Sequence, residues 1–151
     1  MLRLLTVTLP IYFVWEMLQA PAFTGMPPHW LAATAVCAQA TLGDGVIVLG
    51  LFGVGAAVFR DPCWFSPPRW TRYAVIAAAG VLVQVLVEWL MVHRLGRWGY
   101  GAIHPVIPLV DVGVLPVLQA IVLVPTVFWL TSRFRDAHHA VPSPTPGSPG
   151  G

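Results

Sequence analysis

The sequence predicts an all-α integral membrane protein in which four apolar helices span the bilayer and a disordered tail follows them. Two observations predict this class. Of the 151 residues, 57% are hydrophobic and 9% are charged, whereas soluble domains carry about 25% charged residues. Four stretches also reach the roughly 20 apolar residues that a membrane-spanning helix needs. The chain lacks the polar side chains to cover a water-exposed surface, and its length suits one compact unit.

The spans are expected at about residues 4–23, 40–59, 73–92 and 107–130, within a transmembrane domain of residues 1–136. The second span has an earlier candidate start at Leu31. Proline and glycine residues interrupt the chain between spans, as at residues 24–28 and 96–105. The first span carries Glu16 and Gln19, and no small-residue cleavage site follows it. It is therefore expected to be a retained helix rather than a signal peptide.

Small residues dominate the second span, and they allow neighbouring helices to approach closely. They are Gly43, Gly45, Gly50, Gly53, Gly55, Ala56 and Ala57. From residue 137 onward the composition shifts to proline, serine, glycine and histidine, which cannot bury a core. Residues 137–151 are therefore predicted to be a disordered tail, to which we assign no function.

Arginine residues predict the orientation, because cytoplasmic segments carry an excess of positive charge. Six lie on the side that both termini and the middle connection share: Arg3, Arg60, Arg69, Arg72, Arg133 and Arg135. Arg94 and Arg97 lie on the other side. Both termini are therefore expected in the cytoplasm, with the protein in a bacterial inner (plasma) membrane. Tryptophans near the expected helix ends, Trp64 among them, are interpreted as an interfacial aromatic belt.

The most informative residues are acidic side chains within the spans. There is one in each: Glu16, Asp44, Glu88 and Asp111. Because neighbouring helices run in opposite directions, all four are expected at the same depth, about 6–10 Å inside the extracytoplasmic face. A charged side chain at the bilayer centre costs roughly 2.5–3.5 kcal/mol on insertion scales, so these side chains should turn inward and find partners.

Other polar residues are expected at the same end and would line a pocket with the acids. They are Gln19, Gln84, His93, Arg94, Arg97, Trp98, Tyr100, His104 and Gln119. His93, Arg94, Arg97 and His104 are the cationic candidates for pairing with the carboxylates. A purely structural alternative stays open, because carboxylates near helix ends also snorkel to water or lock helices together through arginines.

Several short motifs carry a family resemblance. They are Trp15-Glu16-x-x-Gln19, Leu42-Gly43-Asp44, Glu88-Trp89 and Gly96-Arg97-Trp98-x-Tyr100. In this order, with Pro108, Gly113, Pro116 and Gln119 after them, they resemble a group of short bacterial inner-membrane proteins with four spans. The match covers about the first 130 residues. The resemblance implies the topology and the location of a site, and it implies no activity.

Three functions compete for this sequence. The first is a membrane enzyme or binding protein for a lipid or isoprenoid, in which Glu16 or Glu88 acts as general acid or base and Arg94 and Arg97 hold an anionic headgroup. The second is a transporter subunit for protons, metal ions or an organic cation. The third is an assembly factor for a larger membrane complex. A homo-oligomer and a larger complex both stay open as states of assembly.

Other functions are disfavoured by what the sequence lacks. It has no basic run, so nucleic acid is not expected as a partner. No His-x-x-x-His or Glu-x-x-His spacing is present, and no metal ligands are assigned. The sequence identifies no cofactor, and membrane lipids are the expected partners.

Overall fold

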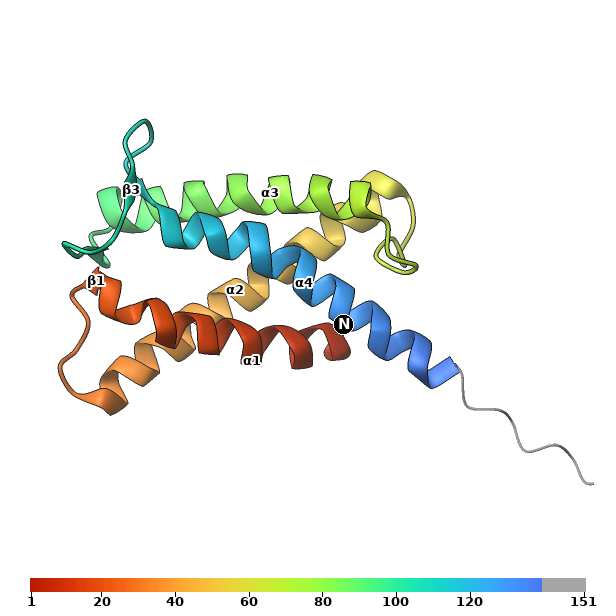
Figure 1. Cartoon of the computed structure of the whole chain (residues 1–151), viewed down its shortest axis with the longest axis horizontal. Helices are drawn as coiled ribbons and strands as arrows, with labels where there is room; N and C mark the ends of the chain where they lie inside the picture. Colours follow the sequence, from red (N-terminus) through yellow and green to blue (C-terminus); the bar gives the residue numbers. More distant parts are fainter. Residues whose placement is uncertain (140–151) are drawn as a thin grey trace, which may run out of the picture.

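The computed structural model describes residues 1–139, so residues 140–151 of the predicted tail lie outside the described residues. The described chain is mostly helical (Figure 1). Its helices are α1 Leu2–Gln19, α2 Trp30–Phe59, α3 Trp70–Trp89 and α4 Val114–His139, with a 3-10 turn η1 Ala20–Ala22 and a π turn η2 Leu90–Arg94. The strands are β1 Phe23–Thr24, β2 Gly99–Tyr100, β3 Val106–Ile107 and β4 Val112–Gly113.

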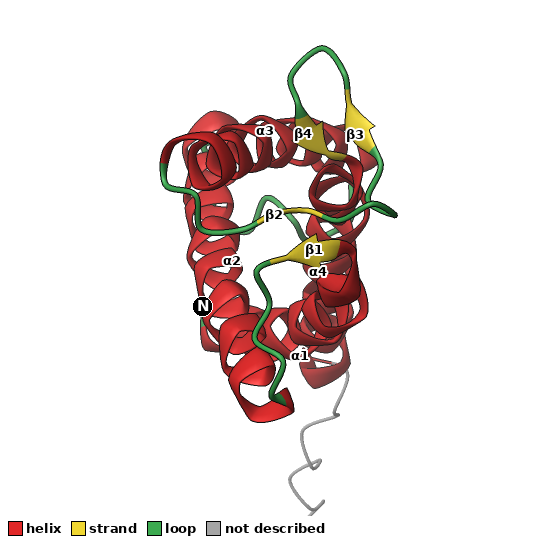
Figure 2. Cartoon of the chain, turned by 90° about the vertical axis from the view of Figure 1, so that its left-hand side faces the viewer, coloured by secondary structure: helices red, strands yellow, loops and turns green. Residues whose placement is uncertain are grey.

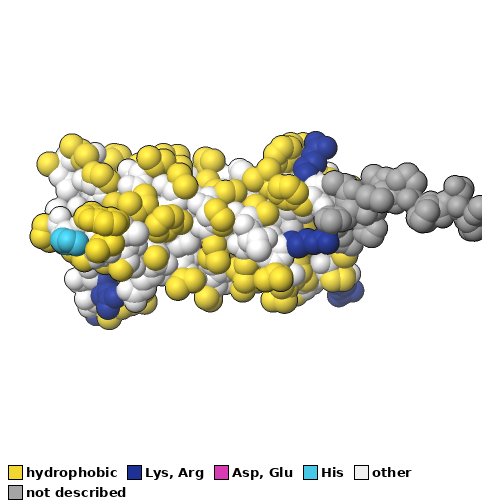
Figure 3. Space-filling model, turned by 90° about the horizontal axis from the view of Figure 1, so that it is seen from below, with side chains coloured by type: hydrophobic (Ala, Val, Ile, Leu, Met, Phe, Trp, Pro, Cys, Tyr) yellow, Lys and Arg dark blue, Asp and Glu magenta, His cyan; other side chains and the backbone are white. Residues whose placement is uncertain are grey.

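Three helical stretches are long and apolar enough to cross a membrane: Trp30–Phe59, Trp70–Arg94 and Val114–Phe134. They support the prediction of a membrane protein. The helix α1 is not among them, because its 18 residues include Arg3, Glu16 and Gln19. Figure 3 shows one face of the molecule, where apolar side chains cover the length of the helices and arginines lie toward the two ends.

Two helix boundaries differ from the ranges first expected. The helix α2 begins at Trp30, two residues after Pro28, and is therefore ten residues longer than the 40–59 span; the earlier candidate start at Leu31 agrees with it to within one residue. It ends where Arg60 adopts a left-handed conformation with φ of 51°. At the other end of the chain, α4 runs to His139, so residues 137–139 of the predicted disordered tail are helical.

The expected start of the last span at Ile107 is wrong. Residues 106–113 form a β-hairpin in which β3 pairs antiparallel with β4, and α4 begins only at Val114. Pro105 and Pro108 supply no backbone N–H for a helical ladder, and Asp111 has φ of 51°, a turn conformation. The segment is apolar, but its backbone cannot continue as a helix.

The helices pack antiparallel to their neighbours along the chain. The helix α1 contacts α2 and α4, and α3 contacts α4 and α2. Small residues allow these contacts: a Cβ on Gly45 would lie 3.1 Å from a methyl group of Leu9, and one on Gly80 would lie 3.2 Å from a methyl group of Val124. Close packing was the expected role of the small residues of the second span. On α2, Gly45 and Gly55 fit this expectation, whereas a Cβ on Gly43, Gly50 or Gly53 would have no atom within 4 Å.

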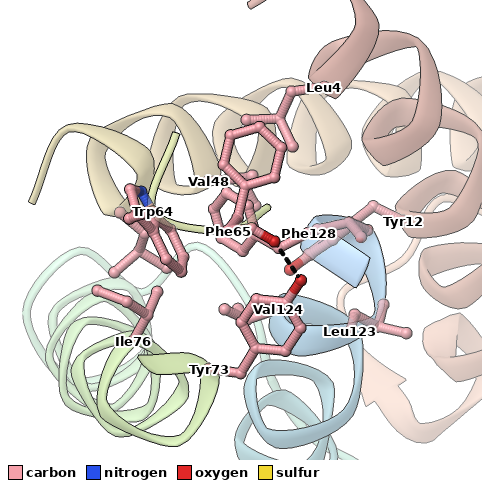
Figure 4. Close-up of a cluster of buried hydrophobic side chains, with 12 residues drawn as sticks. Leu4, Tyr12, Val48, Trp64, Phe65, Tyr73, Ile76, Leu123, Val124 and Phe128 are labelled. Atoms are coloured by element: carbon pink, nitrogen blue, oxygen red, sulfur yellow. Dashed lines mark hydrogen bonds between the residues drawn. The ribbon is translucent and has the colours of Figure 1, made fainter. Parts of the chain in front are cut away.

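An aromatic core fills the end of the molecule that holds the N-terminus (Figure 4). Trp64, from the connection between α2 and α3, is fully buried, and its ring centroid lies 4.7 Å from that of Phe128. Its indole N–H donates to the carbonyl oxygen of Phe52 at 3.1 Å, and the Tyr73 hydroxyl donates to the carbonyl oxygen of Phe65 at 2.7 Å. The interpretation of Trp64 as part of an interfacial belt is therefore wrong.

Two short antiparallel ladders cover the opposite end of the helices (Figure 2). One pairs β1 with β2, and the other pairs β3 with β4. We call the strand β1 and residues 99–113, which contain β2, β3 and β4, the cap. The cap lies where α1 and α3 end and α4 begins, next to the polar residues of the sequence analysis.

Candidate functional site

Three of the four predicted carboxylates come together beneath the cap. Glu16 lies on α1, Asp44 on α2 and Glu88 on α3. The exposed fraction of Asp44 is 8% and that of Glu88 is 2%. Glu16 and Asp44 are within hydrogen-bonding reach of one another, and Glu88 is an electrostatic neighbour of both. We call these three residues the carboxylate cluster.

Two glutamine side chains connect the cluster. Gln19 lies one helical turn after Glu16 and donates to its carboxylate at 2.7 Å. The same amide donates to the side-chain oxygen of Gln119 at 3.2 Å. Gln119, 1% exposed on α4, donates in turn to Asp44 at 2.9 Å. The network thus joins α1, α2 and α4 through side chains that the sequence analysis had selected.

Indole groups supply the remaining donors. The Trp15 indole N–H donates to the side-chain oxygen of Gln19 at 3.0 Å. The Trp98 indole N–H, from the residue just before β2, donates to Glu88 Oε1 at 3.1 Å. Trp98 had been predicted as a site residue, whereas Trp15 had not. The spacing of four residues between Trp15 and Gln19 on one helix is the signal that would have identified it.

None of the predicted cationic residues forms an ion pair with the cluster, although His93 is an electrostatic neighbour of Glu88. Arg94 and Arg97 are exposed, and the Arg94 guanidinium lies 5.4 Å from the centre of the Trp89 ring. His93 contacts Asp111 instead: His93 Nε2 lies 2.8 Å from the Asp111 carbonyl oxygen and 3.6 Å from its carboxylate. Within residues 1–134, whose side chains are described, the carboxylate cluster has neutral hydrogen-bond donors and no ion-pair partner.

Two predicted site residues lie apart from the cluster. The Asp111 side chain is 71% exposed in the loop of the β3–β4 hairpin, so its expected position inside a membrane span is wrong. Gln84 is half-buried on α3, one turn before Glu88, and does not take part in the described hydrogen-bond network.

The cap places two further predicted residues next to Glu88. The hydroxyl of Tyr100, on β2, is within hydrogen-bonding reach of the Glu88 carboxyl group. Burial raises the pKa of the Tyr100 hydroxyl, and the nearby Glu88 adds to this shift, so the hydroxyl remains protonated at neutral pH. The His104 ring packs against Tyr100 with 4.8 Å between ring centroids. Gly113, which the sequence analysis did not treat as a site residue, lies against both rings.

Two surface grooves of about 490 and 430 Å³ lie elsewhere. Arg3, Thr6 and Phe134 are among the residues that line the first, and Leu2, Phe52 and Pro62 are among those of the second. Both are therefore at the end opposite the cap. Among the described residues, no group of three or more His, Cys, Asp or Glu side chains is placed to hold a metal ion.

No protein family, curated protein or solved structure matches this chain at a significant level. The resemblance to short four-span membrane proteins therefore stays a prediction.

Proposed function

We propose that the protein spans the inner membrane four times, with α1 as the fourth span and both termini in the cytoplasm. The helix α1 is about 27 Å long, and η1 extends it toward the roughly 30 Å of the hydrocarbon core. It packs beside two helices that are apolar enough to span. The excess of arginine on the side of the termini supports the orientation. In this arrangement the cap and the carboxylate cluster belong to the extracytoplasmic half.

The carboxylate cluster, in this proposal, binds the positively charged group of a lipid or isoprenoid-like molecule. One observation supports this function above others: two buried carboxyl groups and the half-buried Glu16, from three helices, have neutral hydrogen-bond donors and, among the described residues, no ion-pair partner. Burying an unpaired charge in a low-dielectric environment is strongly unfavourable. A bound cationic group would remove that cost, and the adjacent indoles of Trp15 and Trp98 suit a cation as well.

A membrane-derived ligand fits the site better than a transported ion. The cluster lies under the cap, near the level of lipid headgroups in the proposed orientation. Between it and the opposite end of the helices lies the packed aromatic core of Trp64, Phe65 and Phe128. Such a core offers no continuous polar path, which a transport route through one copy of the chain would need.

The test compares the wild-type protein with Glu88→Gln, after both are extracted from cell membranes with a mild detergent. Native mass spectrometry then detects small molecules that remain bound. Gln keeps an oxygen acceptor for the Trp98 indole and removes the charge. Asp111→Asn is the matched control, because it removes an exposed carboxylate at the same end, and Asn tolerates the positive φ found there.

We expect a bound cationic or zwitterionic lipid on the wild type and on Asp111→Asn, and its loss from Glu88→Gln. Equal retention by all three proteins would contradict the proposal. A ligand-free wild type with normal helix content would contradict it too and would favour an assembly factor.

A further inference from the structure

The cap contains a buried polar atom without a hydrogen-bond partner, Nε2 of His104, whose residue is 6% exposed. The Tyr100 hydroxyl beside it is within hydrogen-bonding reach of Glu88, and its oxygen keeps a lone pair for a further donor. Buried side-chain polar atoms in folded proteins nearly always have a partner, because an unsatisfied one costs about 1–3 kcal/mol. The unpartnered His104 Nε2 therefore indicates that a bound group completes the hydrogen bonding of this ring.

The geometry around His104 fixes which kind of group it can bind. Its Nδ1 lies 2.9 Å from the carbonyl oxygen of Pro105. A carbonyl oxygen only accepts hydrogen bonds, so Nδ1 carries the proton, and Nε2 of the neutral ring presents a lone pair. The ring of Phe23 meets the imidazole edge to face at 4.7 Å and fixes its orientation. Nε2 is thus a pre-positioned acceptor that needs a donor.

Gly113 brings this acceptor and Tyr100 together. A Cβ at Gly113 would lie 3.0 Å from His104 Nε2 and 2.8 Å from Cε1 of the Tyr100 ring. Any side chain at this position would displace the two rings. Because both rings border the same point, and the Tyr100 hydroxyl is next to Glu88, the three side chains form one continuous polar strip.

We propose that Glu88, Tyr100 and His104 bind the primary ammonium of a lipid headgroup; this inference rests on the proposed function and names its ligand class. An ammonium carries three N–H donors, which match the Glu88 carboxylate, the Tyr100 oxygen and His104 Nε2. Trp98 donates to Oε1 of Glu88, and Tyr100 is the other described partner of this carboxyl group, whose two oxygens have lone pairs for a further donor. A quaternary ammonium has no N–H group and would leave Nε2 of His104 unsatisfied.

The cap also gives such a headgroup access. Each of its ladders consists of strands of only two residues. Because these ladders contain so few backbone hydrogen bonds, the cap can open locally at low free-energy cost while the helices beneath it stay folded. The exposed Arg94 and Arg97, which follow Glu88 on the same side of the membrane, are placed to meet the phosphate that such a headgroup carries.

The experiment places the full chain in nanodiscs of two defined lipid mixtures and measures lipid retention by native mass spectrometry. One mixture contains phosphatidylethanolamine, and the other contains phosphatidylcholine with the same acyl chains. The variants are Tyr100→Phe, which deletes only the hydroxyl, and His104→Asn, whose amide N–H replaces Nδ1–H and deletes Nε2. Asp111→Asn is the control. A further sample adds free ethanolamine to the phosphatidylcholine discs.

We expect the wild type and the control to retain phosphatidylethanolamine about tenfold or more over phosphatidylcholine. Both variants should lose most of this preference while they still retain lipid. Equal retention of the two lipids by the wild type, with retention still lost in Glu88→Gln, would overturn the inference and leave the proposed function standing. Retention of neither lipid would overturn both. Binding of free ethanolamine in place of lipid would overturn the assignment to a membrane lipid.

Discussion

The glycine-rich helix α2 allows a sharp test of the packing, because two of its glycines have opposite surroundings. A Cβ on Gly55 would lie 2.8 Å from Cζ2 of Trp64 and closer still to two other atoms of that indole. A Cβ on Gly53, two residues away, would have no atom within 4 Å. The substitutions Gly55→Ala and Gly53→Ala therefore add the same methyl group to the same helix and should differ in effect.

The expected loss of stability in Gly55→Ala follows from the interactions that Trp64 would lose. The indole is fully buried against Phe65 and Phe128, so it has little room to shift. Overpacking of this kind costs about 1–3 kcal/mol, and loss of its hydrogen bond to Phe52 adds about 1 kcal/mol. Gly53→Ala should be neutral or stabilising by up to about 1 kcal/mol, the helix preference of alanine over glycine.

The assay is equilibrium unfolding in mixed micelles titrated with sodium dodecyl sulfate, followed by helix content and tryptophan fluorescence. We expect the free energy of unfolding of Gly55→Ala to fall about 2–4 kcal/mol below that of the wild type. Equal stability of the two alanine variants would refute the packing of Trp64 against α2.

Three further predictions follow. Gln119→Ala and Asp44→Ala should show a coupling free energy of more than about 0.5 kcal/mol in a double-mutant unfolding cycle, because the two side chains are hydrogen bonded, whereas Gln119→Ala and Asp61→Asn should add independently. The pKa of Asp61 is lowered mainly by its hydrogen bond from Arg72, so its contribution to stability is complete above the unfolded pKa of about 3.9 and is lost as the pH falls below it. Acid titrations should therefore show a smaller loss of stability below pH 4 for Asp61→Asn than for the wild type, and identical curves would contradict this. Epitope tags at the two ends of the chain should both be reached only after the inner membrane is permeabilised, and tags on opposite sides would show an odd number of spans.

The sequence predicted the helices better than the segment between α3 and α4. Long apolar runs identify helices whatever their partners are, which is why α2, α3 and α4 were all anticipated. Val106, Ile107, Leu109 and Val110 form an equally apolar run, yet they belong to a hairpin and its loop. Hydropathy alone cannot separate a short apolar strand from the first turn of a span, and the prolines around this run were the better guide.

Whether a residue lies on a helix or in the β3–β4 hairpin also decided which site residues were predicted correctly. Converting sequence position into depth assumes a helix, and it brought Glu16, Asp44 and Glu88 to one level because all three lie on helices. It failed for Asp111, which lies in the hairpin loop. Trp64 was misplaced for a related reason, since a tryptophan next to a helix end can turn into the core as readily as toward the interface.

The choice of partners for the carboxylate cluster is its most informative property. Arginine side chains at Arg94 and Arg97 were available in the sequence, and an internal ion pair would have neutralised the cluster permanently. Amide groups instead orient the carboxyl groups of Glu16 and Asp44, which are also within hydrogen-bonding reach of one another. A hydrogen bond between two carboxyl groups requires that one of them carries a proton. The network of Gln19 and Gln119 therefore joins three helices and also holds the carboxyl oxygens in fixed directions, as the proposed site for a cationic group requires.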